Sequence, residues 1–233
     1  LLRNQSTLKP SLWLYYRLPK NRLPSMPTLL YLHGFNSSPE SAKAQQTQQW
    51  FGKNAPEIEF ICPSLPPYAD QAMALLREIV EARLSEPVFV VGSSMGGFYA
   101  TCLLEHFGLV SGPNLSAVLI NPAVSPARGL DKWLGENRNY HSGESWVFEP
   151  QHIDEYQRWD PAVINNKNNY LVLLQSGDEV LDYRDAEQRY RGCKIILESG
   201  GDHSFIDYHR HLATIHQFLV STVPSNPQLQ PDL

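Results

Sequence analysis

Ser94 has the neighbours that a nucleophilic serine needs. It is the centre of a Gly-Ser-Ser-Met-Gly pentapeptide that follows the apolar run 88–91 and precedes a segment with helical spacing. This order predicts a buried strand, a sharp turn that exposes the serine hydroxyl, and a helix. Such a turn leaves no room for side chains two residues before and two residues after the serine, and Gly92 and Gly96 occupy these positions. A phosphate-binding glycine loop fits less well, because no lysine follows as in a Walker motif.

Asp178 and His203 are the residues best placed to activate this serine. A serine hydroxyl needs an imidazole to take its proton, and the imidazole needs a carboxylate to fix its tautomer and stabilise its charged form. Asp178 follows the apolar run 170–174, and His203 follows the run 193–197 in a Gly-Gly-Asp-His turn. Like Ser94, each comes just after a predicted strand, so the sequence predicts a Ser-His-Asp triad.

Other acids and histidines compete for these roles. Asp182 is the rival acid, but it lies at a predicted helix start, where a capping role is expected. Asp202 adjoins the histidine, so its side chain is expected to point away. Three histidines on the last predicted helix are interpreted as surface residues, and two more fall in a predicted insertion (His209, His211, His216; His141, His152). Because none share one helix face at ligand spacing, we expect no metal site and no cofactor.

A second polar turn follows the apolar run 28–32. It begins His33-Gly34-Phe35. A turn of this kind after the first buried strand can supply a backbone N–H to an oxyanion, and the Phe35 N–H is the candidate donor. His33 is expected to bond the loop backbone rather than to take part in the chemistry.

Alternating strands and helices have to position these turns. Apolar runs predict strands at 28–32, 58–62, 87–91, 116–120, 170–174 and 193–197, and helices are predicted at 38–54, 70–85, 95–106, 183–190 and 209–220. Ser38 is the expected N-cap of the first helix. The alternation predicts an α/β fold, a mostly parallel sheet of about six strands with helices on both faces. Ligands bind at the carboxyl ends of such strands.

The composition fits one globular domain. The chain has 233 residues, of which 42% are hydrophobic and 18% charged. The net charge is −5 and the basic residues are scattered, which argues against a nucleic-acid partner. No apolar run reaches the roughly 18 residues that a membrane span needs. The widely spaced cysteines are expected to be reduced residues of a cytoplasmic protein (Cys62, Cys102 and Cys193).

Three segments differ from this core, which is predicted to span residues 26–223. Residues 1–25 carry five basic residues and no acid, so we expect a leader outside the core, with an edge strand at 11–18 as the alternative. Residues from about 123 to 168 mix aromatic with charged side chains. They predict a small cap over the site, or else a surface excursion that its aromatics anchor. Residues 224–233 are the predicted tail.

Five segments carry a resemblance to a known family: LLYLHGFNSSPESAKA, VGSSMGGFYAT, LINPAV, QSGDEVLDYRDA and GGDHSF. From residue 26 to about 220 the chain resembles the YqiA/YcfP-type (UPF0227) esterases, small bacterial members of the α/β-hydrolase superfamily. The resemblance implies a cytoplasmic serine esterase that acts on short acyl esters or thioesters without metal or cofactor. It implies a triad and two backbone oxyanion donors at matching positions (Ser94, Asp178 and His203; Phe35 and Met95).

The sequence therefore predicts a serine hydrolase that cleaves short-chain carboxylic esters through an acyl-enzyme intermediate. Two alternatives stay open, an acyl-CoA thioesterase and a hydrolase-fold module that binds a ligand without turning it over. The expected partner is a small-molecule ester or thioester, with no nucleic acid and no membrane. Three tryptophans of the insertion are candidates for limiting the acyl pocket (Trp133, Trp146 and Trp159).

Overall fold

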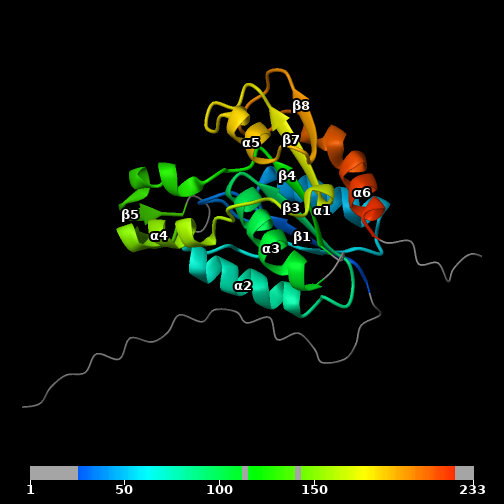
Figure 1. The fold of residues 1–233 in the computed structure, drawn as a ribbon, viewed down its shortest axis with the longest axis horizontal. Coiled ribbons are helices and arrows are strands. Elements are labelled where there is room, and N and C mark those ends of the chain that lie inside the picture. The colour runs from blue at the N-terminus through cyan, green and yellow to red at the C-terminus, as the bar shows by residue number, and fades with distance from the viewer. Residues whose placement is uncertain (1–25, 112–114, 140–142, 224–233) are drawn as a thin grey trace, which may run out of the picture.

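A six-stranded parallel sheet lies at the centre of the molecule (Figure 1). The computed structural model describes residues 26–111, 115–139 and 143–223, so the predicted leader and tail lie outside the described residues. The strand order is β2-β1-β3-β4-β7-β8, with every pairing parallel. The strands are β1 (Thr28–Leu32), β2 (Glu59–Ile61), β3 (Val88–Ser93), β4 (Leu115–Ile120), β7 (Tyr170–Gln175) and β8 (Lys194–Glu198). The predicted fold class is confirmed.

The four inner strands are buried along their whole length, whereas the edge strands β2 and β8 are partly exposed. Helices cover both faces, which is why the inner strands read as continuous apolar runs rather than alternating ones. Successive residues of β1 point to opposite faces. Leu30 and Leu32 pack into one core, and Leu29 and Tyr31 into the other.

Each face of the sheet has its own set of helices (Figure 1). Helices α2, α3 and α5 contribute to the core that contains Leu30, and α1 and α6 to the core that contains Leu29. The helices outside the insertion are α1 (Ala42–Asn54), α2 (Ala69–Glu81), α3 (Met95–Ser111), α5 (Tyr183–Arg189) and α6 (Leu212–Ser221), the last preceded by the 3-10 turn η5 (Tyr208–His211).

Helix α1 begins later than predicted. Its N-cap residue is Ser41, not Ser38. The Ser38 hydroxyl instead accepts a hydrogen bond from the Glu40 N–H (3.1 Å), and the Ser41 N–H donates to the Ser38 carbonyl (3.1 Å). Ser38 thus closes a separate turn before the helix, a local side-chain bond that competes with helix initiation.

The insertion between β4 and β7 contains a hairpin that the sequence did not predict. Its elements are the 3-10 turns η2 (Pro126–Gly129), η3 (Asp131–Trp133) and η4 (Lys167–Asn169), the strands β5 (Gly135–Arg138) and β6 (Ser145–Phe148), and the helix α4 (Pro150–Trp159). Strands β5 and β6 pair antiparallel and are mostly exposed, so they lack the apolar run that marks the central strands. None of the helices in the described residues is long and apolar enough to cross a membrane.

The first residues of α3 lie so close to the end of β1 that there is no room for a side chain at Gly96. A Cβ atom on Gly96 would overlap the backbone carbonyl of Leu32. We expect Gly96→Ala to lower the free energy of unfolding by about 1–3 kcal/mol, because backbone has to move to admit a methyl group. Urea unfolding measures the effect.

Gly52 is the matched control for this substitution. It lies in α1, and nothing is within 4 Å of an added Cβ atom. Gly52→Ala should raise the free energy of unfolding by up to about 1 kcal/mol, because alanine is the better helix former. A Gly96→Ala variant as stable as the Gly52→Ala variant would contradict the close approach.

Candidate active site

Ser94 occupies the turn between β3 and α3, as the pentapeptide predicts. Its φ is 55°, in the left-handed region that is strained for a residue with a side chain. Its backbone is held on two sides, since its N–H donates to the Ile120 carbonyl (3.0 Å) and its carbonyl accepts from the Ala123 N–H (2.9 Å). The end of β4 and the residues after it therefore hold the turn in place.

Three side chains from three different turns meet in one chain of hydrogen bonds. His203 Nε2 lies 3.1 Å from the Ser94 hydroxyl oxygen. His203 Nδ1 lies 2.9 Å and 3.0 Å from the two carboxylate oxygens of Asp178. Asp178 follows β7 and His203 follows β8. All three lie beyond the carboxyl ends of their strands, so the parallel sheet brings them together although they are far apart in sequence.

Asp178 is held as a carboxylate. Its side chain is 2% exposed. Burial acts to raise its pKa, but hydrogen bonds from the His203 ring and from the Leu181 and Val180 N–H groups outweigh burial and lower the pKa. Both N–H groups donate to Asp178 Oδ1 at 2.9 Å. An ionised Asp178 favours the tautomer of His203 with hydrogen on Nδ1, which leaves Nε2 to accept a proton.

The rival acids lie elsewhere. Asp182 is the N-cap of α5, and its side chain accepts from the Arg184 N–H (3.0 Å) and pairs with the Arg184 guanidinium (2.6 Å). Hydrogen bonds from that guanidinium lower the pKa of Asp182 to about 2. The Asp202 carboxylate accepts from the Ser204 hydroxyl at 2.5 Å. Of the three carboxylates, the structure pairs only Asp178 with the imidazole of His203 among the contacts of the described residues.

The turn after β1 lies against Ser94. A Cβ atom on Gly34 would be 3.5 Å from the Cβ of Ser94 and 3.8 Å from its hydroxyl oxygen. The Phe35 N–H follows directly in the chain. Met95 is the first residue of α3, where a backbone N–H has no acceptor within the helix and the helix dipole favours negative charge. The two residues predicted as donors thus follow Gly34, which lies near Ser94, and Ser94 itself.

His33 has a structural environment. It is 2% exposed, and its Nε2 accepts from the Leu65 N–H at 3.1 Å. Its Nδ1 is 2.9 Å from the Gly34 carbonyl, to which a neutral imidazole with Nδ1 protonated donates. These bonds tie the turn after β1 to the segment after β2, in agreement with the predicted structural role.

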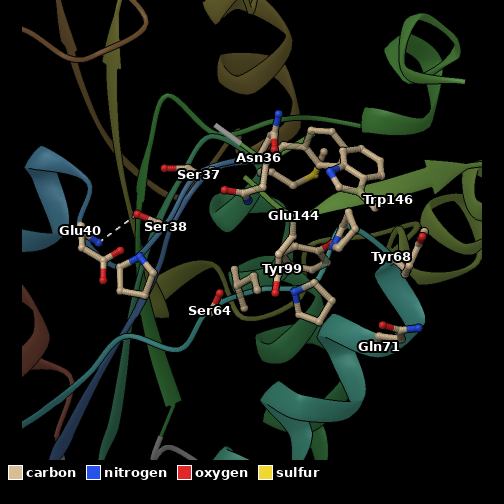
Figure 2. A pocket seen from close by; sticks show the side chains of 18 of the residues that line it. Asn36, Ser37, Ser38, Glu40, Ser64, Tyr68, Gln71, Tyr99, Glu144 and Trp146 are labelled. Carbon is tan, nitrogen blue, oxygen red and sulfur yellow. Dashed lines mark hydrogen bonds between the residues drawn. The ribbon is translucent and has the colours of Figure 1, made fainter. Parts of the chain in front are cut away.

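A cavity of about 920 Å³, shown in Figure 2, is lined by Met95, the next residue after the serine, and by Gly34. Phe35 and Met95 line it together with aromatic and polar side chains from three segments, including Tyr68, Tyr99 and Trp146. The part of the wall that follows β2, at residues 64–71, was not predicted, because that segment carries no chemical motif. Its prolines and its place after a strand end are the signals that could have indicated it.

The insertion forms part of this cavity, but only some of the predicted tryptophans reach it. The rings of Trp133 and Trp146 pack on Phe35, with centroids 5.1 and 5.5 Å away, and Trp146 lines the cavity. Trp159, the third candidate, does not line this cavity. Its indole N–H donates to Asp70 of α2 (2.8 Å), and its ring lies 5.2 Å from that of His106 in α3. Trp159 thus connects α4 to α2 and α3.

One prediction about the remaining histidines also needs correction. His211 is not a surface residue: it is 9% exposed, and its Nε2 lies 3.1 Å from Glu198. It lies in the 3-10 turn η5 before α6, a turn that helical periodicity did not reveal. In the described parts of the chain, no group of three or more His, Cys, Asp or Glu side chains could hold a metal ion.

Solved structures of low sequence identity share this fold. Est1E from Butyrivibrio proteoclasticus superposes with a TM-score of 0.65 at 13% identity, covering 88% of this chain and 91% of that one. Alpha/beta hydrolase domain-containing protein 10 from mouse gives 0.59 at 15% identity, with 83% and 87% covered. An alpha/beta superfamily hydrolase from Oenococcus oeni PSU-1 gives 0.55 at 15% identity, with 85% and 94% covered. The chain thus has the α/β-hydrolase fold.

Sequence comparison identifies a narrower group. The model of one family matches residues 28–220, which is nearly the whole of the described chain and includes every residue of the site above. The chain therefore belongs to the family described as "Uncharacterised protein family (UPF0227)".

Proposed function

We propose that the protein is a serine hydrolase that cleaves short-chain carboxylic esters through an acyl-enzyme intermediate. The observation that carries the proposal is the chain of hydrogen bonds from Ser94 through His203 to Asp178. Nucleophile, base and orienting carboxylate are each within hydrogen-bond reach of the next, which is the geometric requirement for activating a serine.

The residues act in the following roles. His203 Nε2 takes the proton of the Ser94 hydroxyl as its oxygen attacks the ester carbonyl, and Asp178 stabilises the imidazolium that forms. The oxyanion of the tetrahedral intermediate accepts hydrogen bonds from the Phe35 and Met95 N–H groups, which lie beside Ser94. The imidazolium then protonates the leaving alcohol, and a water molecule hydrolyses the acyl-enzyme by the same steps in reverse. None of these steps requires a metal or a cofactor.

The cavity beside the serine is the proposed binding site for the small-molecule ester. Small-ligand sites are concave and mostly apolar, with a few polar groups that orient the ligand. Residues from about 123 to 168 act as a cap, because Trp146 and the neighbouring Trp133 pack on Phe35 at the cavity wall. One Est1E structure has ferulic acid bound, so a protein of similar fold binds a small carboxylic acid.

We also propose that the protein works in the cytoplasm as one hydrolase domain from residue 26 to 223. All three cysteines are unpaired, which suits a reducing compartment. The matched family model ends within these bounds. The partner is the small-molecule substrate, with no role for nucleic acid or membrane.

The first test concerns the nucleophile. Ser94→Ala should remove labelling by a fluorophosphonate probe and lower kcat for p-nitrophenyl acetate by several orders of magnitude, because only the attacking oxygen is lost. Ser93→Ala is the neighbouring control and should keep both activities. Esterase activity that survives in Ser94→Ala at the wild-type rate would sink the assignment.

A second test separates the two acids. Asp178→Asn should lower kcat by a factor on the order of 10⁴, since an amide favours the wrong tautomer of His203. Asp182→Asn should leave kcat within a few-fold of wild type and only weaken the start of α5, because Asp182 contacts Arg184 and not the imidazole. For both variants kcat is measured under conditions in which the same fraction of the protein is folded. A larger rate loss in Asp182→Asn would reverse the assignment.

A third test concerns acyl-chain length. Across soluble p-nitrophenyl esters from acetate upward, each methylene that fits the cavity should add up to about 0.8 kcal/mol to transition-state binding, until the cavity is full. Trp146→Ala should shift the preferred chain length, whereas Trp159→Ala should not, because Trp159 lies on Asp70 away from the cavity. Thioesters of the same chains show whether the sulfur leaving group is also accepted.

The charge of the insertion adds a control to that series. Its many acidic and basic side chains argue against adsorption to a lipid surface. The rate should therefore show no jump when a substrate passes its solubility limit. A continued rise into emulsified long-chain esters, with interfacial activation, would indicate a lipase instead.

A further inference from the structure

Two buried amides lie directly under the turn that carries His203. Gln175 is the last residue of β7, and Asn121 is the first residue after β4. Each is 3% exposed, and neither lines the cavity. No step of the proposed reaction uses them, so their burial needs another reason, because a buried amide is costly unless its hydrogen bonds are made.

Gln175 uses its whole hydrogen-bonding capacity, and three of its four bonds go to the His203 turn. Its side-chain oxygen accepts from the Asp202 N–H (3.2 Å) and the Ile206 N–H (2.9 Å). Its nitrogen donates to the Ile206 carbonyl (2.9 Å) and to Glu198 (2.9 Å). An amide offers two donors and two acceptor sites, so no capacity is left over. The Gln175 side chain therefore bonds the backbone of the turn before and after His203.

Gly201 shows how closely the turn sits on this amide. A Cβ atom at Gly201 would overlap the side-chain oxygen of Gln175. The φ of Gly201 is +78°, which disfavours any other residue as well. A glycine at position 201 thus allows the backbone of the turn to pack directly against the Gln175 side chain.

Asn121 joins the same turn to the nucleophile. Its side-chain nitrogen donates to the Asp202 carbonyl (3.0 Å), and its oxygen accepts from the Gln175 N–H (3.0 Å). The residues on either side hold Ser94, whose N–H donates to the Ile120 carbonyl and whose carbonyl accepts from the Ala123 N–H. The end of β4 and the residues after it thus hold the backbone of Ser94 directly and the His203 turn through the Asn121 amide.

We infer that Gln175 and Asn121 are positioning residues that fix the distance between the Ser94 hydroxyl and His203 Nε2, an inference that rests on the proposed hydrolase function. The two reacting groups come from turns after different strands, so their 3.1 Å separation depends on what holds the turns together. A misplacement of about 1 Å can cost on the order of 10²-fold in rate.

Other side chains that bond the backbone of this turn are more exposed. Glu179 accepts from the backbone N–H of His203 (3.0 Å), and Lys43 donates to the Ser204 carbonyl (2.7 Å). Both bonds are exposed to solvent, where a hydrogen bond to water can replace them. The buried amides have no such replacement, so the turn should depend on them most.

The inference is tested by Gln175→Met, which keeps the length of the side chain without its polar atoms, and by Asn121→Gly, which suits the positive φ of 40° at that position. Asn169→Ala is the matched control. Asn169 precedes the opposite end of β7, where its amide donates to the Leu115 carbonyl (2.8 Å) far from the site. The readouts are kcat and KM for p-nitrophenyl acetate, the rate of fluorophosphonate labelling, and the folded fraction from urea unfolding.

We expect kcat and the labelling rate to fall about 10- to 100-fold in both site variants, with KM within about twofold of wild type. Asn169→Ala should lose stability but keep kcat. If Gln175→Met fails to fold, Asn121→Gly decides alone. Site variants that are folded and keep wild-type kcat, or that change only KM, would overturn the inference. A wild-type protein that neither labels nor hydrolyses any ester would instead overturn the proposed function itself.

Discussion

The strained backbone of Ser94 is the constraint on which the rest of the site depends. A residue with φ of 55° between a strand and a helix persists only where its surroundings over-determine it. Here β3 and α3 lead into and out of the turn, and Gly96 packs against the carbonyl of Leu32. The end of β4 and the residues after it bond the backbone of Ser94 through its N–H and its carbonyl. The turn places the hydroxyl beyond the carboxyl end of β3, where its oxygen lies 3.1 Å from His203 Nε2.

The parallel sheet turns that local constraint into a site. Because all strands of the sheet run in the same direction, the turns after β1, β3, β7 and β8 all lie at the carboxyl end of the sheet. These turns carry the proposed oxyanion donor Phe35, the proposed nucleophile Ser94, the carboxylate of Asp178 and the imidazole of His203. The buried strands supply a rigid base, whereas the turns lie outside the apolar core and can contain polar residues. This division explains why the buried strands are apolar while every proposed functional group follows one of them.

Much of this could be predicted from the sequence because the signals are local. The six strands are apolar runs, and Ser94, Asp178 and His203 each follow one, so residue type and position in the chain agreed. Three features could not be predicted in this way. The β5–β6 hairpin is exposed and lacks an apolar run. Trp159 packs through a contact with Asp70, nearly ninety residues earlier in the chain. The start of α1 was decided by a side-chain bond of Ser38 within its own turn.

The amides under the His203 turn were also invisible in the sequence, since glutamine and asparagine at strand ends have no characteristic spacing. Their neutrality has a physical consequence. The turn already lies near four carboxylates, of Asp178, Glu179, Glu198 and Asp202. A further charge beneath it would alter the field at the imidazole, which has to gain and lose a proton during the proposed reaction. Neutral amides fix the turn through hydrogen bonds alone and leave the carboxylate of Asp178 as the charged group in direct contact with the ring.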